Sequence, residues 1–496
     1  VPSLTMLGPP SPEWGGTPGS NIVKGGNRGE RAGEKAPRVS ANRSEWRAHD
    51  SAICGVPSLT MLGKQSQAGV VRQVPTLSKG ATAGGTSGEG RDEATRESRH
   101  GTAHAPMPSC PGWADGPATR DKRPATGGRG PCILSPVTQT RELLYRAGPA
   151  ARATIRRQGL RPSSIRALFG PASGPKWLVL TGIDRAIIAS GLLTGVSRTG
   201  EGDRPLLVGS SAGGWRALAM ACPDPAAAHR ELEDGYVEQV FDRSVTPGKI
   251  SAAYHAMLSR LMTPARKAHL LNAAAVDVAL HVARARGPAG SSRHRIQATA
   301  MVVAAGLNAV TARTMKLFFT RVLLHSAPHR WRVGFDGEVV QLTEDNLLPA
   351  ALSTGTIPLY MHAVRELPGA SGGRFIDGGL TDYHLNQRYS RDADGIVLFP
   401  HFQERIVPNW FDRYLPRRTP SASALDNVLQ IYPSAEFVAE LPGGRIPNRD
   451  DFIRLIDDPE LRIRRWRETS AASERLGGQF LDDLERGRIP DLVCEI

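Results

Sequence analysis

The stretch that most constrains the fold is residues 205–222, where an apolar run leads into Gly-Ser-Ser-Ala-Gly at 209–213 and then into an Ala-, Leu- and Met-rich segment. These five residues match G-x-S-x-G, the pattern of a sharp turn between a strand and a helix. Gly209 and Gly213 leave room for a tight turn, and the following residues favour a helix. Ser211 is then placed at a helix N-terminus, where free N–H groups and the helix dipole favour negative charge.

Composition divides the chain into three parts. Only 40% of its 496 residues are hydrophobic and 6% aromatic, which is low for a chain that folds throughout. Residues 1–135 are crowded with Gly, Pro, Ser, Thr, Arg and Ala and lack periodicity, so we expect a disordered, low-complexity extension there. We expect residues 136–415 to form the folded domain that carries the site. We expect residues 416–496 to form a mainly helical C-terminal extension that packs on this domain.

Within the folded part, strand patterns alternate with helical patterns, which predicts the α/β class. We expect strands at 163–169, 205–208, 295–305, 315–324, 331–342, 375–376 and 395–400. We expect helices at 177–188, 215–222, 226–242, 251–286, 348–354 and 448–485. The last of these has Arg and Asp/Glu at i, i+3 and i+4, which indicates a solvated helical face.

The net charge of +14 favours anionic partners, either nucleic acid or a membrane surface. The chain has no dense Lys/Arg block and no nucleic-acid module, so we expect no specific nucleic-acid partner. Its five cysteines form no C-x-x-C and predict neither a disulfide framework nor a zinc site. No apolar run approaches the roughly 18 residues that span a bilayer, and no signal-peptide pattern occurs. We therefore expect a cytoplasmic protein with peripheral contact to an anionic membrane.

Two further motifs accompany the serine turn. A Gly-containing loop at 170–176 follows the first expected strand, and Asp377 stands in Ile-Asp-Gly-Gly behind Ala-Leu-Ser-Thr-Gly-Thr-Ile-Pro at 351–358. A lone D-G-G is usually a β-turn. In this order and spacing, however, the three motifs resemble the patatin-like phospholipases over about residues 163–400. The resemblance implies a three-layer α/β/α sheet sandwich and a catalytic dyad, with Ser211 as the nucleophile and Asp377 as the base.

The implied chemistry is consistent with these residue types. A serine hydroxyl is a weak nucleophile until a base takes its proton, and a partly desolvated carboxylate is able to do so. Attack on an ester then creates an oxyanion that needs N–H donors. The family has these donors in its first loop, which usually reads G-G-G-x-[KR]-G.

The matching stretch of this chain departs from that pattern, because residues 172–177 read Ala-Ser-Gly-Pro-Lys-Trp. Only Gly174 and Lys176 match. Gly174 and Ser173 are the candidate oxyanion donors, whereas Pro175 has no N–H and Trp177 replaces a glycine. Lys176 either holds the loop or meets an anionic head group.

The expected function is a serine lipid acyl hydrolase, similar to a phospholipase A or a lysophospholipase, that cleaves fatty acyl esters. No H-E-x-x-H motif or carboxylate cluster occurs, so we expect neither a metal nor another cofactor. Three alternatives stay open. His384 or His401 could complete a Ser–Asp–His triad of the α/β-hydrolase kind. The altered loop could belong to a lipid-binding protein without turnover. The net charge leaves a basic nucleic-acid-binding protein as the third.

Overall fold

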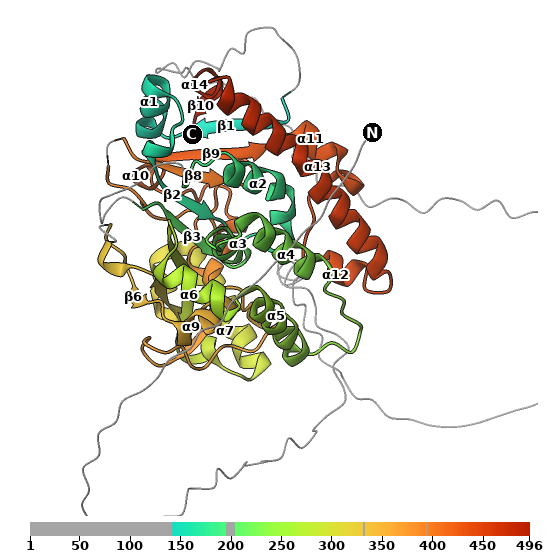
Figure 1. Cartoon of the computed structure of the whole chain (residues 1–496). Coiled ribbons are helices and arrows are strands. Elements are labelled where there is room, and N and C mark those ends of the chain that lie inside the picture. Colours follow the sequence, from blue (N-terminus) through green and yellow to red (C-terminus); the bar gives the residue numbers. More distant parts are fainter. Residues whose placement is uncertain (1–140, 195–203, 331–332, 393) are drawn as a thin grey trace, which may run out of the picture. The chain divides into compact units, whose positions relative to one another are not determined.

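The computed structural model of the chain describes residues 141–194, 204–330, 333–392 and 394–496 (Figure 1). The extension expected at 1–135 lies outside the described residues, as does Trp331, where one of the expected strands begins.

A mixed sheet of ten strands forms the centre of the described part, in the order β10-β1-β9-β8-β2-β3-β4-β5-β6, with β7 paired to β4 (Figure 1). The strands from β9 to β4 are parallel, whereas β1, β5 and β7 each run antiparallel to a neighbour. Their bounds are β1 Leu143–Ala147, β2 Ile165–Gly170, β3 Leu206–Ser210, β4 Asp277–Ala285, β5 Phe319–His325, β6 Glu338–Gln341, β7 Arg374–Asp377, β8 Ile396–Pro400, β9 Val428–Pro433 and β10 Val493–Glu495.

Fourteen α-helices connect and cover these strands within the described residues. They are α1 Pro149–Gln158, α2 Thr181–Ala189, α3 Ala212–Met220, α4 Pro225–Val237, α5 Pro247–Leu261, α6 Pro264–Asn272, α7 His294–Val310, α8 Met315–Phe318, α9 Glu344–Thr354, α10 Ala422–Leu425, α11 Ala435–Glu440, α12 Asp451–Arg454, α13 Pro459–Glu485 and α14 Ile489–Leu492. Three short 3₁₀ helices matter below: η3 Gly174–Leu180, η7 Gly378–Leu380 and η8 Trp410–Tyr414.

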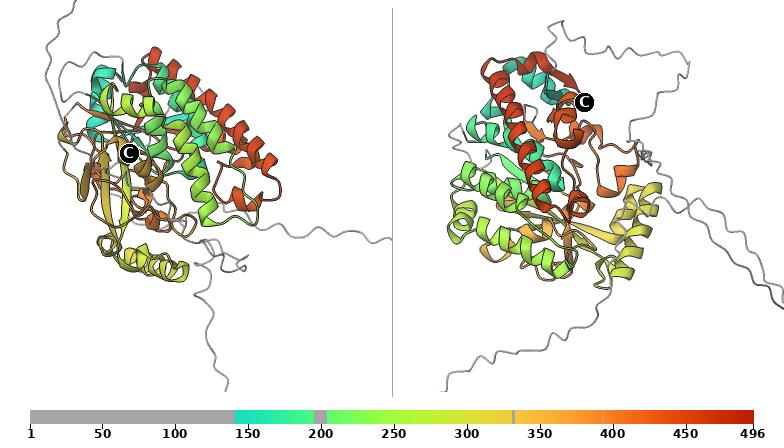
Figure 2. Two further views of the ribbon diagram at one scale, coloured as in Figure 1. Left: turned by 60° about the horizontal axis from the view of Figure 1, so that its bottom comes forward. Right: turned by 90° about the vertical axis from the view of Figure 1, so that its right-hand side faces the viewer.

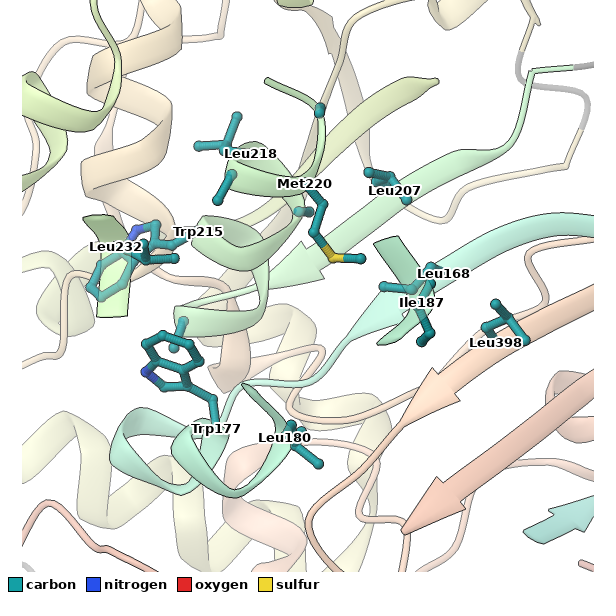
Figure 3. Close-up of a cluster of buried hydrophobic side chains, with 14 of the residues drawn as sticks. Leu168, Trp177, Leu180, Ile187, Leu207, Trp215, Leu218, Met220, Leu232 and Leu398 are labelled. Carbon is teal, nitrogen blue, oxygen red and sulfur yellow. The ribbon is translucent and has the colours of Figure 1, made fainter. Parts of the chain in front are cut away.

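Alternate residues of the central strands pack into two separate hydrophobic clusters, one on each face of the sheet. Leu168 and Leu207 face the helices α2, α3, α4 and α13, and Figure 3 shows them in one cluster with Trp177 and Trp215. Phe169 and Val208 face the other way, against side chains of the mostly irregular segments 385–392 and 401–425, including Leu385, Tyr389 and Ile406. The long α13 runs along the outside of the helical layer beside α2 (Figures 1 and 2). The predicted α/β fold, a central multi-strand sheet with helices packed on it, is thus confirmed.

Several expected elements are confirmed, including the strands β2, β3, β7 and β8 and the helices α2, α3, α4 and α9. Two predictions were wrong. The strand expected at 295–305 is part of α7, whose buried residues Gln297, Ala300, Met301 and Ala304 follow a helical period. The helical pattern read through 251–286 ends with α6, and Asp277–Ala285 is the strand β4. The strand β4 lies between β3 and β5 in the sheet, and its Ala and Val side chains are buried on the two faces of the sheet. This central position overrides helix propensity.

The C-terminal residues also differ from the expected pattern. Residues 428–433 and 493–495 lie in the stretch predicted to be mainly helical, yet β9 is an interior strand of the sheet and β10 is an edge strand. The predicted helix at 448–485 forms as α12 and α13. Its expected solvated face covers only part of α13, because Trp466, Leu476 and Phe480 are buried. The sheet therefore extends across residue 415.

Candidate active site

Ser211 lies between β3 and α3 in a strained backbone conformation. Its φ of 55° and ψ of −131° are rare for a residue with a side chain and persist only where neighbours hold them. The Ser211 N–H donates to Oγ1 of Thr354 (2.9 Å), whose hydroxyl donates to the carbonyl of His281 (2.6 Å). A buried threonine on α9 thus ties the turn to β4.

Two glycines make this turn sterically possible. A Cβ on Gly209 would lie 2.4 Å from the carbonyl carbon of Gly213, and a Cβ on Gly213 would lie 2.1 Å from the carbonyl oxygen of Gly170. Both contacts are with backbone and are too short for any side chain. The glycines of the motif therefore allow β3, α3 and the loop after β2 to approach one another at the serine.

The sheet brings Asp377 to Ser211. Along one edge of β4, β3 pairs as far as Ser210 opposite His281, and β7 continues from Asp377 opposite Val282. The other edge of β4 is occupied by β5. The ends of β3 and β7 therefore meet on consecutive residues of β4, and Oγ of Ser211 donates a hydrogen bond to Oδ2 of Asp377 at 2.8 Å.

The carboxylate of Asp377 has few partners for a buried charge. Its Oδ1 accepts the N–H of Gly379 (2.7 Å), and only 9% of its surface is exposed, against 7% for Ser211. Burial raises the pKa of Asp377 to about 6, although the bonds from Gly379 and Ser211 and the charge of Arg449 lower it. A base with a pKa close to neutral both ionises and accepts a proton in the physiological range.

The loop after β2 crosses this pair. Gly170 contacts Gly213, and the Cβ of Ala172 would lie 2.8 Å from a Cβ on Gly379. Next in the loop, Ser173 is buried, and Gly174 is half-buried with a φ of +53° and open space where a Cβ would lie. The two candidate oxyanion donors therefore belong to a loop that runs beside both members of the pair.

The remaining residues of the loop anchor it. The Nζ of Lys176 lies 4.7 Å from the ring centroid of Phe402, which supports the expectation that this lysine holds the loop. Trp177 is buried against His229 and Tyr236, with edge-to-face ring distances of 5.7 and 5.8 Å. The tryptophan that replaces the family's glycine is therefore a core side chain.

The two histidines of the triad alternative are bonded elsewhere. Nδ1 of His384 accepts the N–H of Val407 (2.9 Å), and Nδ1 of His401 is bonded to the carbonyl of Gln403. Both rings are fully buried and lie against each other, with centroids 4.3 Å apart. Burial lowers the pKa of His384 well below its usual value and that of His401 to about 3, so both are neutral at physiological pH.

Three residues near the pair were not identified in the sequence as parts of the site. Gly379 belongs to the D-G-G motif, and this motif is the sequence signal that could have pointed to its N–H as a donor. Thr354 lies in the 351–358 segment, but nothing there marked its hydroxyl as the support of Ser211. Arg449 follows the expected domain by more than thirty positions, and no pattern linked its charge to Asp377.

The described residues also limit what else the site contains. Across 141–194, 204–330, 333–392 and 394–496, no three His, Cys, Asp or Glu side chains are grouped to hold a metal ion. Within the same ranges, no helix is both long and apolar enough to cross a bilayer.

Residues 182–384 match the family model described as Patatin-like phospholipase. Over these residues the chain is similar to the patatin-like phospholipases. The match includes Ser211 and Asp377 but not the loop at 170–176 or the strands β1, β2, β8, β9 and β10. Members of this family generally hydrolyse lipid esters, and this similarity supports hydrolase activity for the chain. A comparison with curated proteins finds no match.

Proposed function

We propose that this chain is a serine acyl hydrolase that cleaves fatty acyl esters of phospholipids or lysophospholipids, with Ser211 as the nucleophile and Asp377 as the base. The observation that carries the proposal is the 2.8 Å hydrogen bond from Oγ of Ser211 to Oδ2 of Asp377. The strained serine at a helix N-terminus and the near-neutral pKa of the carboxylate support it.

In the proposed reaction, Oγ of Ser211 attacks the acyl carbonyl carbon while its proton passes to Asp377. The negative charge moves to the carbonyl oxygen, where the free N–H groups at the start of α3 and those of Ser173 or Gly174 stabilise it. The C–O bond to the leaving alcohol then breaks, and Asp377 returns the proton to that oxygen. Water hydrolyses the acyl-serine by the same steps, with Asp377 again accepting the proton.

The direct contact between Ser211 and Asp377 favours a dyad over a triad. In a triad, a histidine lies between the serine and the acid. Here the two oxygens of Asp377 accept from Ser211 and Gly379. His384 is bonded to the backbone of Val407, and His401 to the backbone of Gln403. We propose that this reaction needs no cofactor. We also propose that the enzyme binds peripherally to an anionic membrane.

The test is hydrolysis of a long-chain acyl ester by the full chain, together with labelling by a fluorophosphonate. We expect Ser211→Ala to abolish labelling and to lower kcat/KM on the order of 10³-fold or more. Asp377→Asn should lower kcat/KM by about 10²–10⁴-fold. The matched control is Ser210→Ala, because this buried neighbouring serine has no bonded hydroxyl among the described residues, and it should retain activity.

His384→Asn and His401→Asn separate the alternatives, since the asparagine carbonyl or amide can replace the Nδ1 bond of each histidine. Loss of activity in either variant with an intact fold would favour the triad. A wild-type chain that neither labels with the probe nor cleaves any acyl ester would favour a lipid-binding protein. That alternative is supported by Pro175, which removes one N–H from the loop.

A further inference from the structure

Most of the exposed large apolar side chains in the described residues lie on one short segment. Val310 is 81% exposed and Leu317 is 66% exposed, and four more on α7 are 38–47% exposed. We call this set the α7 face; its members are Ile296, Val302, Val303, Leu307, Val310 and Leu317. On α7 the spacings of seven, four and three between 296, 303, 307 and 310 place these residues on one side of the helix. Contiguous exposed apolar surface of this kind usually marks an interaction site.

In the sequence that contains the α7 face, the Lys, Arg, Asp and Glu residues are all of the basic kind. No Asp or Glu occurs between Asp277 and Asp336, whereas Lys and Arg recur there. Arg293, Arg295 and Arg313 are exposed and form no ion pair with any described residue. The partner that complements this surface is therefore both apolar and anionic.

The cations at the start of α7 oppose the stability of the helix itself. Arg293 is the N-cap, without a capping side-chain bond, and His294 and Arg295 follow it; the first turn contains no acid. Positive charge at a helix N-terminus is unfavourable because the dipole is positive there. Sequence choices that oppose local stability are expected at functional sites, which indicates that these arginines serve an external anion.

A second group of interfacial side chains adjoins α7. The 3₁₀ helix η8 packs on α7, and the guanidinium of its Arg413 stacks over Trp410 and Tyr414, 3.9 and 4.5 Å from the ring centroids. Tyr414 is 61% exposed. Arg418 donates to the carbonyl of Asn308 near the C-terminus of α7 (3.0 Å). Trp, Tyr and Arg are the side chains that favour the boundary between lipid headgroups and acyl chains.

The buried side of α7 rests against the elements that hold the candidate base. Met301 and Ala304 share a hydrophobic cluster with Ile376 and Leu380, which flank Asp377. Figures 1 and 2 show α7 at the end of the described part away from α13. A surface bound to the exposed side of α7 would therefore be separated by this one helix from the cluster that contains Ile376, the neighbour of Asp377.

We propose that the α7 face docks this chain on an anionic phospholipid bilayer, with the apolar side chains entering the headgroup region and Arg293, Arg295 and Arg313 binding lipid phosphates and carboxylates. The proposal rests on the proposed function, because a lipid hydrolase must reach substrate held in a bilayer. A second copy of the chain complements the face poorly, since two such faces would bring the same arginines together.

The test is co-sedimentation of the full chain with phosphatidylcholine vesicles, with and without phosphatidylserine. We expect binding to require phosphatidylserine and to weaken with salt. The variant R293Q/R295Q/R313Q should bind on the order of 10²-fold more weakly, at about fivefold per arginine. Its matched control is R230Q/R260Q/R454Q, which removes three exposed arginines from α4, α5 and α12. These arginines also form no ion pair with any described residue, and the control should lose little binding.

A second variant tests the apolar part. V310Q/L317Q should lose vesicle binding, whereas V240Q/I453Q, which changes exposed apolar residues elsewhere, should not. Circular dichroism and hydrolysis of a water-soluble short-chain ester report whether each variant keeps its fold and its site. Equal vesicle binding by V310Q/L317Q and wild type would overturn the proposal. The proposal would also fall if wild type were a dimer that V310Q/L317Q converts to a monomer without any change in vesicle binding, because the face would then bind a second copy of the chain. Vesicle binding without ester hydrolysis by wild type would refute the proposed function and leave the docking surface standing.

Discussion

Asp377 and Asp184 are both buried carboxylates beside α3, yet their partners differ in kind. Asp184 on α2 accepts two hydrogen bonds from the guanidinium of Arg216, each 2.6 Å long, and its Oδ2 lies 3.0 Å from Nε2 of His229. Asp377 accepts from one hydroxyl and one backbone N–H. One carboxylate faces a cation in direct contact, and the other bonds only to neutral groups.

The pKa values follow this difference. Burial raises the pKa of both groups, but for Asp184 the charge of Arg216 and the bonds from His229 and Arg216 outweigh it and lower the pKa to about 2. For Asp377 burial dominates and the pKa rises to about 6. Asp184 is therefore permanently ionised and structural, whereas Asp377 retains the proton affinity that a general base needs.

The largest expected effect is on the stability contributed by Asp184. Asp184→Asn leaves the buried Arg216 without a counter-charge, so we expect the free energy of unfolding in urea to fall by about 3–5 kcal/mol. The matched control is Asp457→Asn, which breaks the exposed pair with Arg243 and should change stability little. Comparable losses from the two variants would show that Asp184 is not the more important charge.

Asp377→Asn should have the opposite effect on stability. Because the folded pKa of Asp377, about 6, lies above its unfolded value, stability falls as the pH rises from about 4, where the unfolded carboxyl ionises, to about 6, where the folded one does. Asparagine cannot ionise, and its carbonyl and amide can still meet Gly379 and Ser211. We expect the variant to be about 3 kcal/mol more stable than wild type at pH 8. The two chains should converge below pH 4; a variant that is less stable at pH 8 would contradict this account.

The same pKa predicts how activity depends on pH. The base must be ionised in the free enzyme, so kcat/KM of wild type should rise about tenfold per pH unit below a midpoint near pH 6 and then level off. Initial rates on a soluble ester between pH 4.5 and 8 measure the limb. A limb that stays unchanged when Asp377 is replaced would mean that another group titrates.

Arg449 should give the smallest effect. Its charge lowers the pKa of Asp377, and its guanidinium stacks over Tyr360 at 5.1 Å. In Arg449→Gln we expect the acid limb of kcat/KM to move to higher pH, because the proton is then held more tightly. Arg449→Lys keeps the charge and should restore the wild-type limb, whereas a purely structural role for Arg449 would leave the limb in place in both variants.

Much of the site was predictable because its parts are local motifs. Ser211 lies in a strand–turn–helix whose glycines are needed within five residues, and Asp377 ends a short strand ahead of two glycines. The prediction of a strand at 295–305 was wrong because the Thr and Val residues of this apolar stretch favour a strand locally, while its alanines pack on the buried side of α7 at helical spacing. Likewise, β4 reads as a helix in the sequence, but it is an interior strand whose two faces are buried in hydrophobic clusters on the two sides of the sheet.

Residue order alone was enough to predict an α/β domain and a sharp strand–helix turn at 209–213, since close backbone contacts leave short, recognisable patterns of glycine. Asp377 was singled out only by the resemblance of the three ordered motifs to the patatin-like phospholipases. Residue order did not reveal that β3 and β7 end on adjacent residues of β4, that Thr354 supports the strained serine, or that Asp184 is compensated and Asp377 is not. Those properties depend on contacts between residues far apart in the chain. A carboxylate's pKa is set by what surrounds it in space, and only the folded packing brings those groups together.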